Sequence, residues 1–304
     1  MSTENRLATL EQVLAGLMRR YQARVPDVAN IVAAMAAEGL VAGPEQIEND
    51  HIAFRTMGVP QLGIASLERI FLHYGYRRRD AYRFPAKQLD AFWYSPPRPD
   101  LPRIFISELR VGDLSAEAQS IIASYTDEVP RDPVEALDLD DAAEVDDFLH
   151  RALWRLPTWG DYSRLAEESE YAAWVIYNRY YLNHFTVTIH NLPAGYNTIP
   201  AFNAFLEARG FRLNDAGGKV KTSPDGKLLQ SSTVAELIEA EFAGGETHMI
   251  AGSYVEFAER RPLDQFAHLP AGQLSREHRR EGFEAGNADK IFESTYSEQT
   301  GRRS

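Results

Sequence analysis

The sequence predicts an α+β protein in which two β-α-β-β-β modules pair around a central sheet cleft, flanked by helices. Two observations support this prediction. First, strand-like and helix-like segments follow one another in the same order twice along the 304-residue chain. Second, the opening strands carry His51 and His184, and the closing strands carry Glu108 and Glu256. A repeated order of elements indicates a duplication, although identity between the two halves is low.

Two helices are expected before the first module. The segments ATLEQVLAGLMRRYQ and VPDVANIVAAMAAEG place apolar residues at helical spacing. Pro26 suits the first turn of the second helix, and Gly39 and Gly43 close the segment.

Each module consists of strand-like runs and one helix. In the first, HIAFRT is followed by the helix IASLERIFLHYG, which ends at Gly75, and by YRRRDAYRF, KQLDAFWYS and PRIFISELRV. In the second, NHFTVTIHN is followed by TIPAFNAFLEARG, which ends at Gly210, and then by FRLND, KLLQSSTVAEL and THMIAGSYVEFAERR. The second module is longer, and we assign the extra length to the hairpin-like insertion GGKVKTSPDGK.

The rest of the chain connects or follows the modules. The acidic stretch DLDDAAEVDD is interpreted as a solvated helix face and turn rather than a metal site, and Trp154, Trp159 and Trp174 as packing anchors. We assign the chain to a single domain, 1–304, with five parts: N-terminal helices 1–48, module one 49–110, a helical insert 111–180, module two 181–262, and a tail of irregular and short helical pieces 263–304.

Composition excludes several classes of function. The chain has no cysteine, which rules out disulfides, thiolate nucleophiles, iron–sulfur clusters and Cys-ligated zinc. A net charge of −12 argues against a nucleic-acid partner, although a small positive pocket for an anionic ligand is compatible with it. No apolar run is long enough to span a membrane, and the first residues lack the order of a signal peptide. We therefore expect a cytoplasmic protein without a membrane partner; the oligomeric state is left open.

Convergence of the paired modules would bring His51, His184 and Glu256 together. Two histidines and one carboxylate occupy one face of a metal octahedron and leave positions for substrate and dioxygen, which suits non-haem Fe(II) enzymes. The spacing alone does not prove this, because ligands so far apart carry no short signature. Each histidine could instead be a hydrogen-bonded core residue.

Other residues could take the ligand positions. His190 and His248 are rivals for the histidine positions. Glu108 is the counterpart of Glu256 in module one, and it could be a ligand or accept a hydrogen bond from a ligand histidine. The remaining histidines are expected at the surface: His73, His150, His268 and His278.

Arg55 shares a strand face with His51. Alternation places His51 and Arg55 on one side of the strand and Ile52 and Phe54 on the other. At ideal strand rise, His51 and Arg55 are about 13 Å apart along the strand. A buried guanidinium needs an anion, which is either a protein carboxylate or a bound ligand. Three consecutive polar residues on a predicted strand of module two could also contact a ligand: Gln230, Ser231 and Ser232. The alternative is that they form an ordinary polar strand face.

At these residues the sequence resembles a known family. The segments HIAFRTMG, GYRRRDAYRFPAKQLDAFWYSPP, LPRIFISEL, NHFTVTIHN and GFEAGNADKIFEST are similar to those of the DUF1338 family, whose characterised members are 2-oxoadipate dioxygenase/decarboxylases, also called D-2-hydroxyglutarate synthases, of lysine catabolism. The resemblance runs from about residue 45 to 297 and implies a core like the vicinal-oxygen-chelate fold, in agreement with the duplication. The chain is shorter than the characterised bacterial members, whose extra segments contribute to the substrate end of the pocket.

The resemblance implies a metal site and a reaction. His51, His184 and Glu256 match the family's iron ligands, and Arg55 matches the arginine that holds a substrate carboxylate. The implied activity is Fe(II)-dependent conversion of 2-oxoadipate and O2 to 2-hydroxyglutarate and CO2. The substrate would lie against His51, His184, Arg55 and Gln230. Two alternatives remain, a metal-dependent lyase or isomerase of the same fold and a metal-free module that binds a small molecule.

Overall fold

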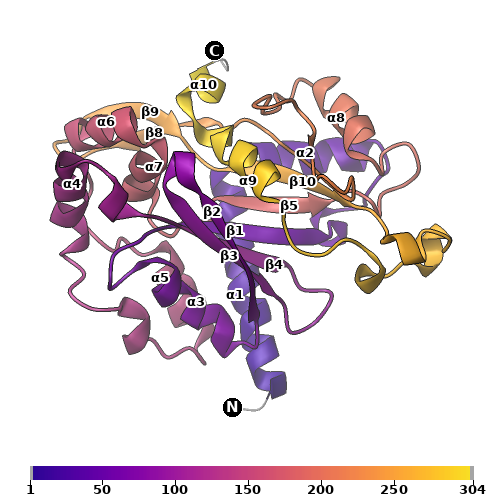
Figure 1. The fold of residues 1–304 in the computed structure, drawn as a ribbon, viewed down its shortest axis with the longest axis horizontal. Coiled ribbons are helices and arrows are strands. Elements are labelled where there is room, and N and C mark those ends of the chain that lie inside the picture. Colours follow the sequence, from indigo (N-terminus) through magenta and orange to yellow (C-terminus); the bar gives the residue numbers. More distant parts are fainter. Residues whose placement is uncertain (1–2, 302–304) are drawn as a thin grey trace.

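Two helices precede the sheet, as predicted from the sequence. The computed structural model describes residues 3–301. In it, α1 (Thr3–Arg24) and α2 (Pro26–Ala37) are separated at Val25, and Pro26 occupies the first turn of α2. Both helices lie behind the sheet (Figure 1) and bury apolar residues such as Leu17 and Ile31 in the core.

Each module has five elements in the predicted order β-α-β-β-β. In the first module they are β1 (Asn49–Met57), α3 (Gly63–His73), β2 (Arg77–Phe84), β3 (Leu89–Ser95) and β4 (Arg103–Leu109). In the second they are β5 (His184–Thr188), α8 (Ile199–Glu207), β6 (Lys221–Thr222), β7 (Leu228–Ser232) and β10 (Tyr254–Arg260).

All eight of these strands form one mixed sheet in the order β2-β3-β4-β1-β5-β10-β7-β6. Within each half the first strand pairs in parallel with the last, and the two first strands, β1 and β5, meet antiparallel at the centre. The same strand order on both sides of this junction confirms the predicted α+β fold of paired modules. It also makes β1, β5 and β10 immediate neighbours.

Helices of the insert pack beside the first module. They are α4 (Ala116–Thr126), α5 (Ala142–His150), α6 (Trp159–Glu168) and α7 (Glu170–Asn178). The Asp141 side chain in DLDDAAEVDD accepts hydrogen bonds from the first turn of α5, which agrees with the interpretation of this stretch as a helix boundary. Trp154 and Trp174 are buried anchors, and Trp159 is half-buried.

Three details of module two differ from the prediction. FRLND forms only one isolated bridge, from Leu213 to Thr233. GGKVKTSPDGK is not the insertion, because it contains β6 and the turn into β7 of the main sheet. The extra length is a separate hairpin of β8 (Leu237–Glu241) and β9 (Thr247–Ala251), and β9 ends before Gly252 and Ser253. THMIAGSYVEFAERR therefore belongs to two sheets rather than to one strand.

The tail consists of short pieces and crosses the front of the sheet (Figure 1), where α9 (Ala285–Ile291) is followed by one 3₁₀ turn (Phe292–Thr295) and by α10 (Ser297–Thr300). α9 contacts β2, β6 and β7. No helix within residues 3–301 combines the length and the apolar character that crossing a membrane requires.

Candidate metal and substrate site

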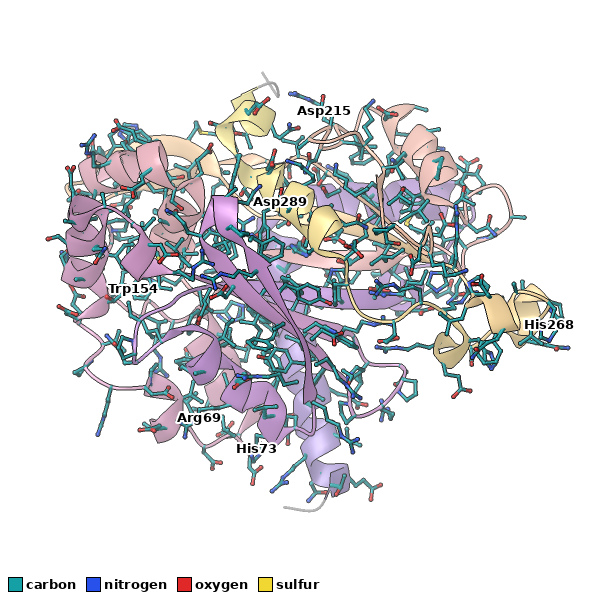
Figure 2. The ribbon with its side chains drawn as sticks, viewed as in Figure 1. Arg69, His73, Trp154, Asp215, His268 and Asp289 are labelled. Atoms are coloured by element: carbon teal, nitrogen blue, oxygen red, sulfur yellow. The ribbon has the colours of Figure 1, made fainter. Side chains whose placement is uncertain are left out.

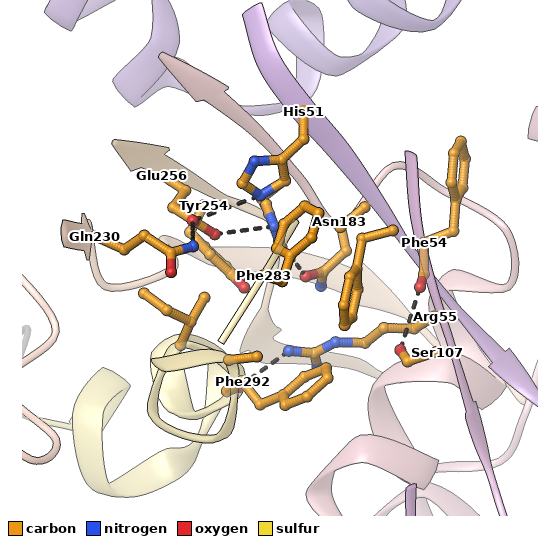
Figure 3. Close-up of a pocket in the computed structure, with 15 residues that line it drawn as sticks. His51, Phe54, Arg55, Ser107, Asn183, Gln230, Tyr254, Glu256, Phe283 and Phe292 are labelled. Carbon is orange, nitrogen blue, oxygen red and sulfur yellow. Dashed lines mark hydrogen bonds and ion pairs between the residues drawn. The ribbon is translucent and has the colours of Figure 1, made fainter. Parts of the chain in front are cut away.

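His51, His184 and Glu256 converge on one point of the sheet, because their strands are neighbours. His184 Nε2 lies 3.1 Å from Glu256 Oε2, and His51 Nε2 lies 3.5 Å from Glu256 Oε1. One ligand atom from each residue lies within 4.8 Å of the others, and all three side chains are buried. Figure 3 shows His51 and Glu256 of this cluster. No other group of three His, Asp or Glu side chains within residues 3–301 has this spacing.

The pKa values of the three side chains are consistent with a cation-binding site. Burial alone would raise the pKa of Glu256, but the two imidazoles outweigh it and lower the pKa to about 2. Burial alone would lower the pKa of His51, but Glu256 and Asp50 leave it raised. Burial lowers the pKa of His184. The charged form of the buried Glu256 carboxylate therefore depends on a positive charge beside it, which is either a protonated imidazole or a metal ion.

The donor set fits a metal ion. Asp50 Oδ1 lies 2.8 Å from His51 Nδ1, and Asn183 Oδ1 lies 2.9 Å from His184 Nδ1. With the Nδ1 atoms engaged in these contacts, both Nε2 atoms are directed at Glu256. Histidine ligands of metals are usually supported in this way through the second ring nitrogen. The sequence offered a signal for these supports, since each directly precedes its histidine, but the prediction did not include them.

Arg55 is fully buried without an acidic partner. Its Nη1 donates to Thr295 Oγ1 (2.9 Å) and its Nη2 to the Phe292 carbonyl (3.0 Å). The residue is 1% exposed, and among the described residues the hydrogen-bond partners of the guanidinium include no carboxylate. Aromatic rings surround the guanidinium at 5.1–5.6 Å: Tyr171, Trp174 and Phe292. Burial raises the pKa of Glu170, and Arg55 is near enough to oppose this rise, but Glu170 makes no direct ion pair with the guanidinium. The arrangement therefore favours a bound anion as the direct partner of Arg55.

Arg55 and the triad line the same pocket (Figure 3). Three buried polar atoms on its wall make no hydrogen bond of normal geometry: Arg55 Nε, Tyr254 Oη and Asn183 Nδ2. The Tyr254 hydroxyl lies near the side chains of Arg55 and Ser294. Burial raises the pKa of Tyr254 even though Arg55 opposes this, so the phenol stays protonated and can donate. Buried donors without partners are costly. Their convergence around one pocket indicates a ligand that accepts hydrogen bonds.

The pocket wall includes residues that sequence reasoning missed. Phe105, Phe283, Ile291 and Phe292 supply an apolar lining, and Ser107 and Ala288 contribute small side chains. Tyr254 could have been found, because it lies two residues before Glu256 and so shares its strand face. The tail residues lie in GFEAGNADKIFEST, which resembles the family, but no local pattern assigned them to a pocket. They reach it because the tail crosses the sheet.

The three polar candidates on β7 have different surroundings. Gln230 lines the pocket, where its Nε2 donates to Glu256 Oε1 at 2.6 Å and its Oε1 accepts from Asn287. Ser231 donates to Asn203 of α8, and Ser232 contacts Ser294. Of the three, only Gln230 is placed to contact a pocket ligand or to orient Glu256.

Glu108 is not the structural counterpart of Glu256. His51 pairs with Arg103 across β1 and β4, and His184 pairs with Tyr254 across β5 and β10. Two residues further along the closing strand comes Phe105 in module one and Glu256 in module two, so Phe105 takes the equivalent position. Glu108 instead accepts a hydrogen bond from Ile64 N (2.8 Å) at the start of α3.

The rival histidines lie outside the cluster. The Nδ1 atom of His190 accepts from Arg260 N (3.1 Å), and burial lowers the pKa of His190 to about 3. His248 is on β9, stacked on Trp159 at 3.8 Å. Figure 2 shows His73 and His268 at the periphery. His150 was expected at the surface, but its side chain is 3% exposed because its Nδ1 bonds to the Asp146 carbonyl and its ring packs on Tyr181.

Comparisons with known proteins point to one family. The family model for 2-oxoadipate dioxygenase/decarboxylase matches residues 13–269. The 2-oxoadipate dioxygenase/decarboxylase of Arabidopsis thaliana, described as chloroplastic, is 45% identical over 270 residues, which span 85% of this chain and 71% of the relative. The crystal structure of the hydroxyglutarate synthase from Oryza sativa in complex with 2-oxoadipate has a TM-score of 0.90 at 41% identity, covering 99% of this chain and 96% of that one.

A more distant structure supports the fold alone. A glyoxalase-superfamily protein from Ralstonia eutropha has a TM-score of 0.70 at 22% identity, covering 90% of this chain and 85% of that one. The predicted similarity to the vicinal-oxygen-chelate fold is therefore confirmed.

Proposed function

Because the chain belongs to the 2-oxoadipate dioxygenase/decarboxylase family, we propose that it is an enzyme that converts 2-oxoadipate and O2 to 2-hydroxyglutarate and CO2. One carbon leaves as CO2, and both atoms of O2 are retained in the two products, so no second reductant is required. The observation that supports a dicarboxylate substrate is Arg55, a buried guanidinium without an acidic partner in the same pocket as the triad.

We propose Fe(II) as the cofactor, held by His51, His184 and Glu256. Bound there, the metal would supply coordination positions for the 2-oxo acid and for dioxygen. The donor set supports this proposal, since two imidazoles and one carboxylate form the facial arrangement that non-haem iron oxygenases use. Gln230 would keep Glu256 in place through the hydrogen bond to Oε1.

The other pocket residues would position the substrate. Arg55 would bind the distal carboxylate and so fix the position of the substrate chain relative to the metal ligands. The backbones of His51 and Arg55 are about 13 Å apart along β1, and the long arginine side chain can span much of this distance. The Tyr254 hydroxyl makes no hydrogen bond of normal geometry and is placed to donate to the same ligand. The apolar wall around Phe283 would exclude water from the reacting centre.

Oxygen uptake by the Fe(II)-reconstituted protein tests this proposal. The assay would compare 2-oxoadipate with 2-oxoglutarate, with pyruvate and with 2-oxohexanoate, which has the same chain length but lacks the distal carboxylate. We expect uptake coupled one-to-one to CO2 and 2-hydroxyglutarate with 2-oxoadipate, and little with 2-oxohexanoate. Turnover of an acid without oxygen uptake would favour the lyase or isomerase alternative. Absence of both metal binding and turnover would favour the binding module.

The physiological setting is proposed on the same basis. A role in lysine catabolism follows from the proposed substrate, and the cytoplasmic location stays a prediction from the sequence.

A further inference from the structure

We propose that Asp50 is the positioning residue of this metal centre, that it holds the His51 imidazole with Nε2 toward Glu256, and that Arg260 and Arg103 fix Asp50 in turn. The inference rests on the proposed metal site. It adds three residues that neither belong to the triad nor line the substrate pocket.

The contact between Asp50 and His51 selects one form of the imidazole. Asp50 Oδ1 lies 2.8 Å from His51 Nδ1, and both side chains are 2% exposed. A carboxylate can only accept a hydrogen bond, so the proton of the neutral imidazole is held on Nδ1. The lone pair is then on Nε2, which lies 3.0 Å from the Thr186 hydroxyl and 3.5 Å from Glu256 Oε1.

Two arginines saturate the carboxylate of Asp50. Arg260 makes a two-pronged contact, with Nε donating to Oδ2 at 2.7 Å and Nη2 donating to Oδ1 at 2.9 Å. Arg103 adds a third bond, from Nη1 to Oδ2 at 3.1 Å, and is itself paired with Glu281. Planar two-pronged contacts fix orientation as well as distance. Asp50 is therefore unable to rotate away from His51 without breaking bonds to a buried guanidinium.

Arg260 also determines what lies beside His51. Its Nη1 donates to the carbonyls of Arg280 (3.0 Å) and Gly282 (2.7 Å). The next residue, Phe283, packs edge-to-face on the His51 ring with centroids 4.7 Å apart. One arginine thus connects the support behind the imidazole to the aromatic residue on its pocket side.

The second histidine provides an internal comparison. His184 is supported by Asn183, a neutral amide, at 2.9 Å, and no arginine of the described residues contacts that amide. A charged acceptor raises the basicity of a histidine ligand more than an amide does. From this asymmetry we infer that the negative charge of Asp50, and not just the presence of an acceptor, strengthens His51 as a ligand.

Titration of the metal-free protein with Co(II), followed by its visible absorption, tests the inference without turnover. Asp50→Asn keeps an acceptor but removes the charge, and we expect the dissociation constant to rise about 10- to 100-fold. The matched control Asn183→Asp adds a charge behind the other histidine and should not raise the dissociation constant.

A second test is NMR of zinc-loaded protein with ¹⁵N-labelled histidine. The Nδ1 resonance of His51 should be that of a protonated nitrogen, and an unprotonated Nδ1 would overturn the proposal.

Loss of folding is separated from loss of positioning by a second pair of variants. Asp50→Asn leaves two buried guanidinium groups short of a counter-charge, which can prevent folding. The Arg103→Gln substitution removes one of these positive charges. The Co(II) dissociation constant of the double variant Asp50→Asn/Arg103→Gln is therefore compared with that of Arg103→Gln alone. Melting temperatures of the metal-free forms show whether both variants are folded. A tenfold or larger rise in the dissociation constant supports the proposal, and equal constants overturn it. Failure of the unmodified protein to bind Co(II) would instead overturn the proposed metal site itself.

Discussion

Tyr254 lies directly opposite His184 in the parallel pair of β10 and β5, and its ring stacks on the imidazole with centroids 4.7 Å apart. The stacking holds the phenol on the pocket wall, while its hydroxyl makes no hydrogen bond of normal geometry. Replacing Tyr254 by Phe keeps the ring and removes only this donor. We expect the KM for 2-oxoadipate to rise about tenfold, corresponding to ~1.5 kcal/mol for a hydrogen bond to a charged acceptor.

The control for Tyr254→Phe is Tyr180→Phe. Tyr180 also has a buried hydroxyl without a hydrogen bond of normal geometry, near Ser66, but it does not line the pocket. Steady-state kinetics should show an unchanged KM for this variant. Equal effects of the two substitutions would show that the Tyr254 hydroxyl does not contact the substrate.

Arg55→Ala should weaken binding of dicarboxylate 2-oxo acids. The guanidinium has no competing carboxylate among the described residues, so its loss leaves the substrate anion unpaired in a buried site. We expect a cost of about 2–5 kcal/mol, measured as an increase in KM. The same variant should have a much smaller effect on 2-oxohexanoate, and an unchanged KM for 2-oxoadipate would return Arg55 to a structural role.

His184→Ala should abolish stoichiometric metal binding and leave the fold largely intact. The imidazole supplies one of the three proposed ligands, and its removal should raise the Co(II) dissociation constant by at least about 100-fold, more than the loss of a supporting residue. The control is His248→Ala, since His248 lies on the separate hairpin and stacks on Trp159. Circular dichroism would establish folding. A His184→Ala protein with full metal content and turnover would contradict the triad.

Metal affinity should fall as the pH falls. The pKa of His51 is raised by Glu256 and Asp50, so in the metal-free protein a proton occupies this imidazole that the metal must displace. Below the raised pKa, the Co(II) dissociation constant should rise by up to about one decade per pH unit for each proton displaced. Titrations at several pH values would measure this slope, and a flat profile from pH 8 to pH 5 would contradict it.

Stability of the metal-free protein should respond to acid through Glu256. Because its folded-state pKa is lowered to about 2, the carboxylate contributes stability above its ordinary pKa of 4.5, and this contribution is lost as the pH falls from there toward 2. The shift corresponds to about 3 kcal/mol. Denaturant unfolding of the unmodified protein and of Glu256→Gln should show that the variant lacks this acid-dependent loss.

Glu108→Ala should reduce stability without changing metal affinity. Glu108 Oε2 satisfies the Ile64 N–H in the first turn of α3, and loss of such a cap typically costs about 0.5–2 kcal/mol. Denaturant unfolding and Co(II) titration of the same preparation would separate the two effects. Weaker metal binding by this variant would contradict the assignment of Glu108 to the helix start.

The sequence by itself was sufficient for the repeated element order, and it named His51, His184 and Glu256 as candidate ligands. Strand and helix periodicity is local, so it indicated β1, α3, β5 and α8 close to where they occur, and the parity of β1 correctly placed His51 and Arg55 on one face while the Phe54 ring packs on Phe71 of α3. The resemblance to a family added the ligand assignment, which spacing alone left open.

Only the tertiary structure decided which side chains meet. Glu108 and Glu256 are both in closing strands, but strand register places Phe105 at the position equivalent to Glu256, and register depends on pairing between distant segments. His248 and Glu256 share parity in the sequence, yet the break at Gly252 puts them in different sheets. Asp50 and Arg260 lie 210 residues apart, and no local pattern predicts their ion pair. Local periodicity determines the elements, whereas packing over long sequence separations determines the site.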